Sequence, residues 1–319
     1  RHLAGAIGLP CATVLTGEEI AQMSQAALEA RAADTDLFVR VSPDQKLRIV
    51  HAVRARGHTV GFIGDGINDA PAIRAADVGL SVDGATDVAR EASDMIMLAP
   101  DLSVLADGIA EGRRTYANIM KYLRMGTSSN FGNMLTMALA SLVLPFLPLT
   151  AVQVLLNNLL YDLSQTGIPF DHADPPLLAR PHGWDMKALV RFTLVMGPLS
   201  SVFDIATFAL FLWVFKVDVA TFRSAWFVES MATQILVVLV IRTAGPAWGL
   251  KPHRALMITA LGCLGVALAL PYVPVAGMLG FEPLGLREGL AIGALVTIYL
   301  ALAEGFKRWA LPIGERLQA

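Results

Sequence analysis

Hydrophobic and polar residues follow two different patterns along this chain, and the pattern changes between residues 100 and 120. In residues 12–100, short β-branched runs alternate with amphipathic stretches, as in a parallel sheet covered by helices. From Met120 onward, apolar stretches follow one another, as in helices that cross a bilayer. The pattern predicts a doubly wound α/β domain followed by an all-α, polytopic membrane domain of six helices.

Capping signals predict where the first helices and strands lie. Thr16 with Glu19 and Ser42 with Gln45 both have the spacing of a capping box, and Pro43 suits the first helical position. We expect a helix near 18–31, a strand over 38–41, a helix from Ser42 to about Arg56 and a strand over 59–63.

The loop after that last strand, residues 64–71, carries the candidate chemistry of this domain. In an open α/β sheet the reactive crevice lies beyond the carboxyl ends of the strands. Gly64 and Gly66 let the backbone turn sharply, while Asp65, Asn68 and Asp69 offer hard oxygen ligands suited to Mg²⁺ beside a phosphate. The loop therefore predicts a site of phosphoryl transfer.

Residues 102–147 contain no proline before Pro145 and predict one long helix. Such a helix is about 65 Å long, roughly twice the thickness of a bilayer core, so its first half must be a stalk. We expect a domain over 1–101, a stalk over 102–122, a membrane domain over 123–311 and a tail over 312–319.

Six spans are expected, near 123–147, 151–170, 189–215, 224–241, 255–275 and 287–306. The loops and tail on the stalk side hold Arg180, Lys187, Arg191, Arg242, Lys251, Arg254, Lys307, Arg308 and Arg316, and the opposite side holds Lys216, Arg223 and Arg287. By the positive-inside rule, the first domain and the C-terminus are cytosolic.

The first two predicted spans are unusually polar. Asn130 and Asn133 share one helix face, as do Asn158 and Asp162, and Gln165 lies one turn further. Polar groups at membrane depth are costly and usually face a polar pathway or a site, although they also serve as hydrogen bonds between helices.

Two further acids lie in later predicted spans. Asp204 is a possible ligand on the same path, whereas we interpret Glu229 as a structural acid paired with a nearby group.

Composition agrees with a membrane protein, since 55% of residues are hydrophobic and the mean hydropathy is +0.55. A net charge of −2 without a dense basic stripe argues against a nucleic-acid partner. Cys11 and Cys263 show no metal-binding spacing, and each is expected to be a free thiol.

Three segments in this order resemble signatures of the P-type ATPase phosphorylation domain, which has a haloacid-dehalogenase-like fold. They are Val41-Ser42-Pro43-Asp44-Gln45-Lys46, Gly64-Asp65-Gly66-Ile67-Asn68-Asp69 and Ala76-Asp77-Val78-Gly79-Leu80-Ser81. The resemblance implies that Lys46 contacts the phosphoryl group, that Asp65 holds the catalytic Mg²⁺, and that Asn68 and Asp69 order the loop.

The nucleophile of that family is the aspartate of an Asp-Lys-Thr-Gly segment, which this sequence lacks. The family's nucleotide-binding domain, actuator domain and first four spans are not found in it either. The resemblance implies that ATP binding and ATP hydrolysis belong to a full-length pump, with the N-terminal half as a partner of this chain.

The two polar spans match the ion-binding fifth and sixth spans of the family, which implies that Asn130, Asn133, Asn158 and Asp162 hold the transported cation. Calcium pumps have a glutamate where this chain has Asn133. A single carboxylate among amides suits Mg²⁺, which keeps its waters, better than Ca²⁺.

The segments 157–171, 197–204 and 245–246 resemble the bacterial magnesium-transporting branch, which imports Mg²⁺ across the inner membrane. A calcium pump remains one alternative. A soluble phosphatase with the same loop and a membrane fragment without catalysis are the others.

Overall fold

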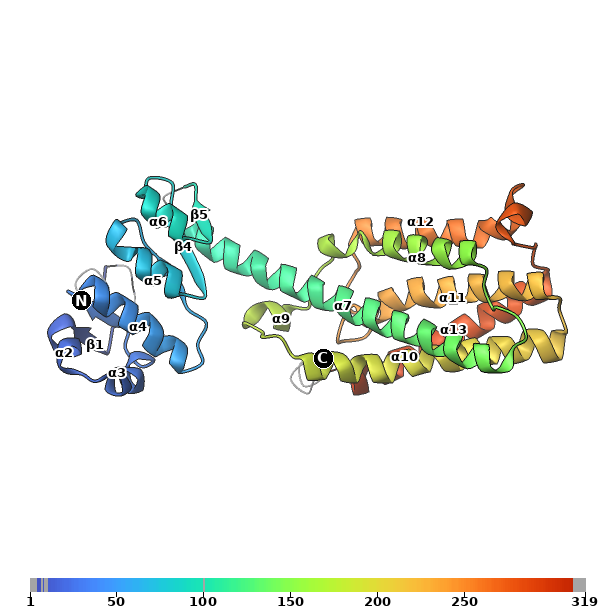
Figure 1. The fold of residues 1–319 in the computed structure, drawn as a ribbon, viewed down its shortest axis with the longest axis horizontal. Coiled ribbons are helices and arrows are strands. Elements are labelled where there is room, and N and C mark those ends of the chain that lie inside the picture. Colours follow the sequence, from blue (N-terminus) through green and yellow to red (C-terminus); the bar gives the residue numbers. More distant parts are fainter. Residues whose placement is uncertain (1–4, 7, 9–10, 100, 312–319) are drawn as a thin grey trace. The chain divides into compact units, whose positions relative to one another are not determined.

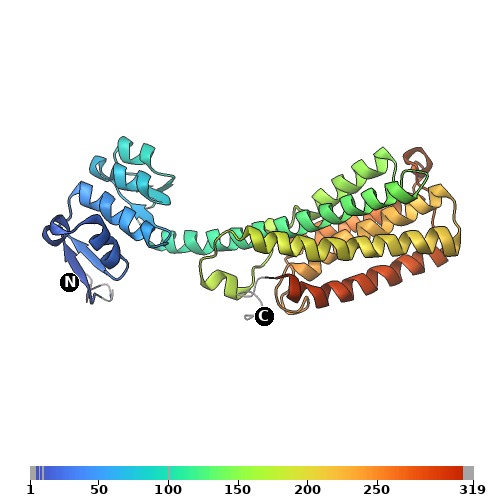
Figure 2. The same cartoon turned by 60° about the horizontal axis from the view of Figure 1, so that its bottom comes forward.

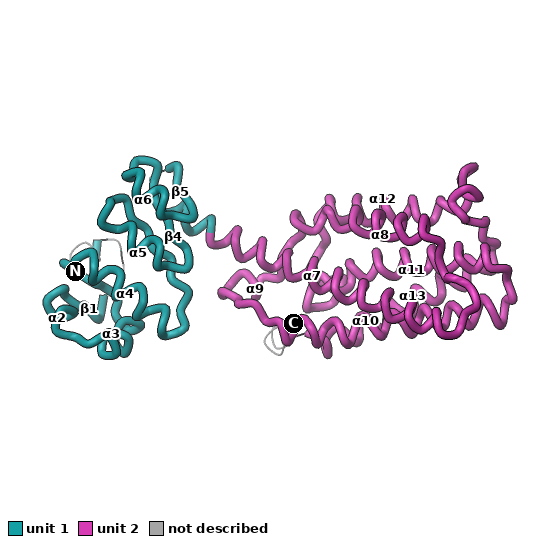
Figure 3. Tube along the Cα trace, viewed as in Figure 1, with its two compact units in different colours: residues 1–108 teal, residues 109–319 magenta. Residues whose placement is uncertain are grey.

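The computed structural model describes residues 5–6, 8, 11–99 and 101–311 of the chain. The chain divides into two compact units, residues 1–108 and residues 109–319 (Figure 3). The boundary falls inside the stalk predicted over 102–122. The predicted tail, including Arg316, lies outside the described residues.

The first unit consists of short strands and short helices (Figure 1). In chain order these are β1 (Val14–Thr16), α2 (Gly17–Gln22), α3 (Gln25–Ala32), β2 (Leu37–Val39), α4 (Pro43–Ala55), β3 (Gly61–Ile63), a 3₁₀ turn (Ile67–Asp69), α5 (Ala70–Ala75), β4 (Val78–Val82), α6 (Asp87–Ala92) and β5 (Met95–Met97). All described strand pairs are parallel, as predicted. They form two small sheets, β1-β2 and β3-β4-β5, instead of the single sheet that we expected.

Local capping signals located the helix starts well but missed one helix end. Ser42 and Gln45 form the predicted capping box at the start of α4, and Thr16 and Glu19 form one at α2. The prediction of one continuous helix near 18–31 is wrong, because the chain leaves helical geometry at Met23. Ser24 then caps α3 by accepting a hydrogen bond from Ala27 N–H.

The described part of the second unit is helical. Its elements are α7 (Ser103–Val143), which begins in the first unit, α8 (Ala151–Gln165), α9 (Pro175–Ala179), α10 (Met186–Ala209) with a π-helical end (Leu210–Phe215), α11 (Val219–Ile241), α12 (Arg254–Ala269) and α13 (Leu286–Ala310), with 3₁₀ turns at Ile168–Phe170, Leu270–Tyr272 and Ala276–Leu279. Figures 1 and 2 show α10, α11 and α13 running side by side.

Four helices among the described residues are long and apolar enough to cross a membrane. They are Met186–Phe215, Val219–Ile241, Arg254–Tyr272 and Leu286–Ala310. The chain is therefore a multi-pass membrane protein. The long helix predicted over 102–147 is confirmed as α7, whereas α8, with 15 residues and a length of about 22 Å, ends five residues before the predicted limit. Spans at 123–147 and 151–170 stay predictions.

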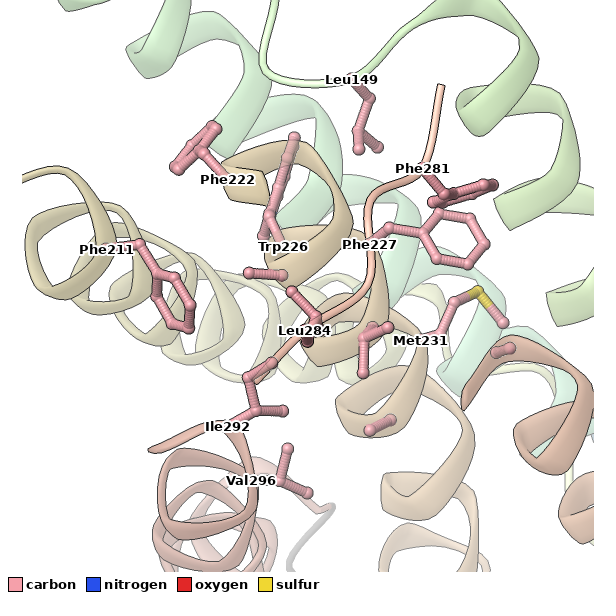
Figure 4. Close-up of a cluster of buried hydrophobic side chains, with 14 of the residues drawn as sticks. Leu149, Phe211, Phe222, Trp226, Phe227, Met231, Phe281, Leu284, Ile292 and Val296 are labelled. Atoms are coloured by element: carbon pink, nitrogen blue, oxygen red, sulfur yellow. The ribbon is translucent and has the colours of Figure 1, made fainter. Parts of the chain in front are cut away.

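Helix α11 forms the centre of the second unit and packs against α8, α10, α12 and α13. Its first half carries Trp226, Phe227 and Met231, which are buried against Phe281 and neighbouring apolar side chains (Figure 4). The Phe227 and Phe281 rings meet edge to face, with centroids 4.8 Å apart. A second apolar cluster lies around Val237, Val238 and Ile241 near the other end of the helix.

We predict that the close contact of the segment after α8 with α12 tolerates no side chain at Gly167. A Cβ atom there would lie 2.5 Å from Leu256 Cα and 2.6 Å from Leu256 N, which are backbone atoms. Gly167→Ala should lower the thermal unfolding midpoint in detergent by about 2–10 °C, the scale of overpacking. Gly262→Ala, where a Cβ atom meets nothing within 4 Å, is the control. Equal midpoints in the two variants would contradict this packing.

Candidate functional site

The loop that follows β3 has a well-defined backbone. Gly64 N–H donates to the carbonyl of Leu80 at 3.1 Å, and the Ser81 hydroxyl donates to the carbonyl of Gly64 at 2.9 Å. A Cβ atom on Gly64 would lie 2.5 Å from Asp69 Cβ, so only glycine fits. The Asp65 carbonyl accepts from Thr86 N–H at 3.0 Å. These contacts hold the loop at the carboxyl end of the β3-β4-β5 sheet.

Two of the predicted catalytic residues, Lys46 of α4 and Asp69 of this loop, form an ion pair. Lys46 Nζ lies 2.6 Å from Asp69 Oδ1, and Asp69 is largely buried while Lys46 is about one-third exposed. An ammonium group has three N–H donors, so Lys46 can hold Asp69 and still donate to a phosphate oxygen. The sequence indicated both residues but not their ion pair, which joins positions 23 residues apart.

Asp65 and Asn68 lie at the surface of the same loop. Within the described ranges, no three His, Cys, Asp or Glu side chains are grouped closely enough to hold a metal ion. The donors still fit Mg²⁺, which is commonly held by one or two carboxylates with waters and phosphate oxygens. Asp65 is the exposed carboxylate of the loop and Asp69 the ion-paired one.

The polar residues predicted to bind the transported ion lie on α7 and α8 with their sides toward the surface. Asn130, Asn158 and Asp162 are exposed, and Asn133 is half-buried. The residues next to them in sequence, Ser129 and Tyr161, lie on the buried faces of the two helices. The Tyr161 hydroxyl donates to Ser129 Oγ at 2.9 Å. Periodicity therefore identified residues that share a face without indicating which face is buried.

Asp204 lies on α10 and is 2% exposed. The Thr136 hydroxyl and the Trp226 indole N–H donate to its two oxygens, each at 2.7 Å. These bonds connect α7, α10 and α11 through one carboxyl group. Glu229 of α11 is fully buried, and the acid Asp204 is its neighbour. The role of Glu229 as a paired structural acid stays a prediction.

A buried group of charges at the other end of the bundle escaped the sequence analysis. Asp171 accepts from Lys121 Nζ at 2.9 Å and from Arg242 Nη1 at 3.0 Å, and all three side chains are at most 5% exposed. His253 N–H also donates to Asp171, at 3.0 Å, and Arg242 donates to the Leu250 carbonyl. The sequence hinted at this group only through basic residues at the ends of apolar stretches. Such residues are also common in exposed loops, so they did not indicate a buried group of charges.

The pKa values of this buried group follow from burial and charge together. Burial alone would raise the pKa of the Asp171 carboxyl, but the Lys121 ammonium, the His253 N–H and the Arg242 guanidinium together lower it. Burial lowers the pKa of Lys121, against the opposing effect of Asp171. Asp171 is therefore an anion at neutral pH and balances part of the buried positive charge.

The sequence of this chain is similar to those of known proteins over most of its length. The family model described as "Cation transporting ATPase, C-terminus" matches residues 146–309. The chain is 43% identical over 308 residues to the "Magnesium-transporting ATPase, P-type 1" of Salmonella typhimurium strain LT2, covering 95% of this chain and 34% of that protein.

Two further relatives define the range of similarity. The protein of the same name from Escherichia coli K12 is 44% identical over 303 residues, which covers 93% of this chain and 34% of that protein. A "Calcium-transporting ATPase" of Bacillus subtilis strain 168 is 30% identical over 311 residues, covering 90% of this chain and 34% of that protein. The chain thus spans about a third of the length of the curated relatives it matches.

We predict that Asp171→Asn destabilises the second unit, because it leaves Lys121 and Arg242 buried without a counter-charge. Breaking a buried ion pair costs about 3–5 kcal/mol, so the thermal midpoint in detergent should fall clearly. In the wild type, the stabilisation by Asp171 should be complete above its unfolded-state pKa of about 3.9 and be lost as the pH falls through the lower folded-state value.

The control for this variant is Asp107→Asn, which changes an exposed carboxylate on α7 in the same way. It should leave the midpoint within about 1 °C, the scale of surface substitutions. If both variants unfold at the same temperature as the wild type, the buried charges do not hold the helices together.

Proposed function

The chain belongs to the cation-transporting ATPase family, and from this premise we propose that it is the C-terminal third of a P-type pump that transports Mg²⁺. The observation that carries the proposal is the degree of similarity: 43–44% identity to two magnesium-transporting ATPases, against 30% to a calcium-transporting one. The polar face of α7 and α8 supports the proposal, because Asp162 is the carboxylate among its amides. Mg²⁺ is commonly held by one or two carboxylates with waters.

The first unit is proposed to be the end of a haloacid-dehalogenase-like phosphorylation domain. Lys46 neutralises charge on the transferring phosphoryl group, and Asp69 orients Lys46 through their 2.6 Å ion pair. Asp65 holds the catalytic Mg²⁺, with Asn68 and Asp69 ordering the loop. That ion supplies charge neutralisation at the phosphoryl oxygens. The aspartate nucleophile and most of the ATP site come from the rest of the pump.

The second unit is proposed to cross the bacterial inner membrane six times. Four apolar helices satisfy the length and composition of a span, and the C-terminal half of α7 and the short α8 supply two more. The excess of Lys and Arg on the side of Asp171 favours a cytosolic location for the first unit and for the C-terminus. Four spans also count against a soluble phosphatase.

The transported ion is proposed to bind at the outward polar face of α7 and α8. Asn130, Asn133, Asn158 and Asp162 supply one carboxylate and three amides there, and helices from the N-terminal half of the pump cover this face. Asp204 lies behind it, bonded to Thr136 of α7, and transmits the charge state of the site to α10 and α11. The proposed direction of Mg²⁺ transport is into the cell.

We predict that Asp65→Asn in the full-length pump abolishes ATP hydrolysis while leaving expression and membrane insertion intact. The amide keeps the size of the side chain but removes the charge that holds the catalytic Mg²⁺. Phosphate release and phosphoenzyme formation from labelled ATP measure the effect. The control is Asp83→Asn, in the turn after β4. Hydrolysis at the wild-type rate in Asp65→Asn would remove this residue from the site.

We predict that Asp162→Asn weakens transport of Mg²⁺ strongly, because it removes the charge that attracts the ion. Uptake into proteoliposomes should need at least about tenfold more Mg²⁺ for half-saturation, the effect of 1.4 kcal/mol of lost binding. Transported Mg²⁺ must be varied separately from the Mg²⁺ that accompanies ATP. An unchanged half-saturating concentration would contradict the role of Asp162, and activation by Ca²⁺ would favour a calcium pump instead.

A further inference from the structure

Ser81 is a buried polar residue in an otherwise apolar strand. It lies in β4 between Leu80 and Val82, and its side chain is 0% exposed. Among the described residues of the first unit, Asp69 and Ser81 are the two buried polar side chains. A buried hydroxyl group is costly unless it forms a hydrogen bond, so the bond that Ser81 forms indicates its role. Asp69 belongs to the loop after β3, and Ser81 binds that loop.

The Ser81 hydroxyl binds the loop at its first residue. It donates to the carbonyl of Gly64 at 2.9 Å, and the Gly64 N–H donates to the Leu80 carbonyl at 3.1 Å. Gly64 directly follows β3, which ends at Ile63 and pairs in parallel with β4 through Ile63 and Leu80. Ser81 therefore extends the attachment of β3 to β4 by one residue, into the loop.

This hydrogen bond fixes the peptide plane that precedes Asp65. The Gly64 carbonyl and the Asp65 N–H belong to one planar peptide unit, so holding the oxygen also sets the direction of the N–H. The next peptide plane is held in the same way, because the Asp65 carbonyl accepts from Thr86 N–H at 3.0 Å. Both planes that flank the Asp65 Cα atom are thus held through their oxygens, and they determine the direction in which the Asp65 side chain leaves the backbone.

The direction of Asp65 matters because its side chain is exposed. An exposed side chain is not packed in place, so its position depends on the backbone that carries it. Mg²⁺ requires near-octahedral geometry, with ligand distances of about 2.0–2.1 Å. Residues that orient a metal ligand typically contribute about tenfold to a hundredfold to metal affinity or activity, although they do not contact the ion. Ser81 is fully buried and acts on Asp65 through the backbone.

We propose that Ser81 is a positioning residue of the phosphorylation site, whose hydroxyl orients the Gly64–Asp65 peptide so that Asp65 presents its carboxylate to the catalytic Mg²⁺. The inference rests on the proposed function, in which Asp65 holds that ion. Without the hydroxyl, the Gly64 carbonyl loses the donor that orients it, and the Asp65 carboxylate occupies a wider range of positions. A higher concentration of Mg²⁺ is then needed to fill the site.

Ser81→Ala in the full-length pump removes the hydroxyl and retains a small side chain in β4. Amide hydrogen exchange without Mg²⁺ should be about fivefold faster in the peptide that covers residues 64–69, the effect of one lost hydrogen bond. Phosphoenzyme formation from labelled inorganic phosphate should need at least about tenfold more Mg²⁺ to reach half of its maximum. The maximum itself should be retained at saturating Mg²⁺, because Asp65 is still present.

Ser93→Ala is the matched control, since the Ser93 hydroxyl also donates to a backbone carbonyl, that of Arg90 at 2.8 Å, at the end of α6. This variant should leave the exchange of residues 64–69 and the half-saturating Mg²⁺ concentration as in the wild type. In Ser81→Cys, a weaker donor of similar size replaces the hydroxyl, which keeps the test valid if Ser81→Ala does not fold.

Wild-type exchange of residues 64–69 and wild-type Mg²⁺ dependence in both Ser81 variants would overturn the positioning role. Faster exchange over the whole first unit with an unchanged half-saturating Mg²⁺ concentration would also overturn it, because Ser81 would then only stabilise the fold. A wild-type pump that forms no phosphoenzyme would instead count against the proposed function. The exchange comparison uses no Mg²⁺ and would still show whether Ser81 holds the loop.

Discussion

The arrangement of the second unit depends on one buried carboxylate that neutralises two buried cations. Asp171 accepts hydrogen bonds from Lys121 on α7, Arg242 after α11 and the backbone before α12. These groups come from positions 50 to 82 residues away along the chain. Because an unpaired buried charge is so unfavourable, these segments can separate only together. The contact fixes the part of α7 that lies next to α8.

The helices that Asp171 joins leave one polar surface without a covering helix in this chain. Helix α8 packs its other faces against α11 and α12, so Asn158 and Asp162 point outward. The same is true of Asn130 on α7. At membrane depth such a surface needs a protein or water-filled partner, which the proposed N-terminal half of the pump would supply. The proposed transport site therefore uses Asp162, the carboxylate of this surface.

Local signals in the sequence predicted much of the fold, and long-range contacts account for most of what it missed. The capping boxes at Thr16 and Ser42 and the course of α7 depend on residues a few positions apart, so they could be inferred directly. The Lys46–Asp69 pair and the charges around Asp171 join distant segments, which no spacing rule identifies. For Asp162, periodicity indicated the shared face, but the choice of buried face depends on α11 and α12.

We propose that this chain forms part of a pump in which one carboxylate among amides selects Mg²⁺. The most direct measurement reconstitutes the full-length wild-type pump in proteoliposomes and follows ATP-driven accumulation of Mg²⁺ and of Ca²⁺ with ion-selective dyes. Vesicles without ATP, and vesicles with a non-hydrolysable ATP analogue, give the passive leak. We expect ATP-dependent accumulation of Mg²⁺ and none of Ca²⁺. Accumulation of Ca²⁺ in preference to Mg²⁺, or of neither ion, would contradict it.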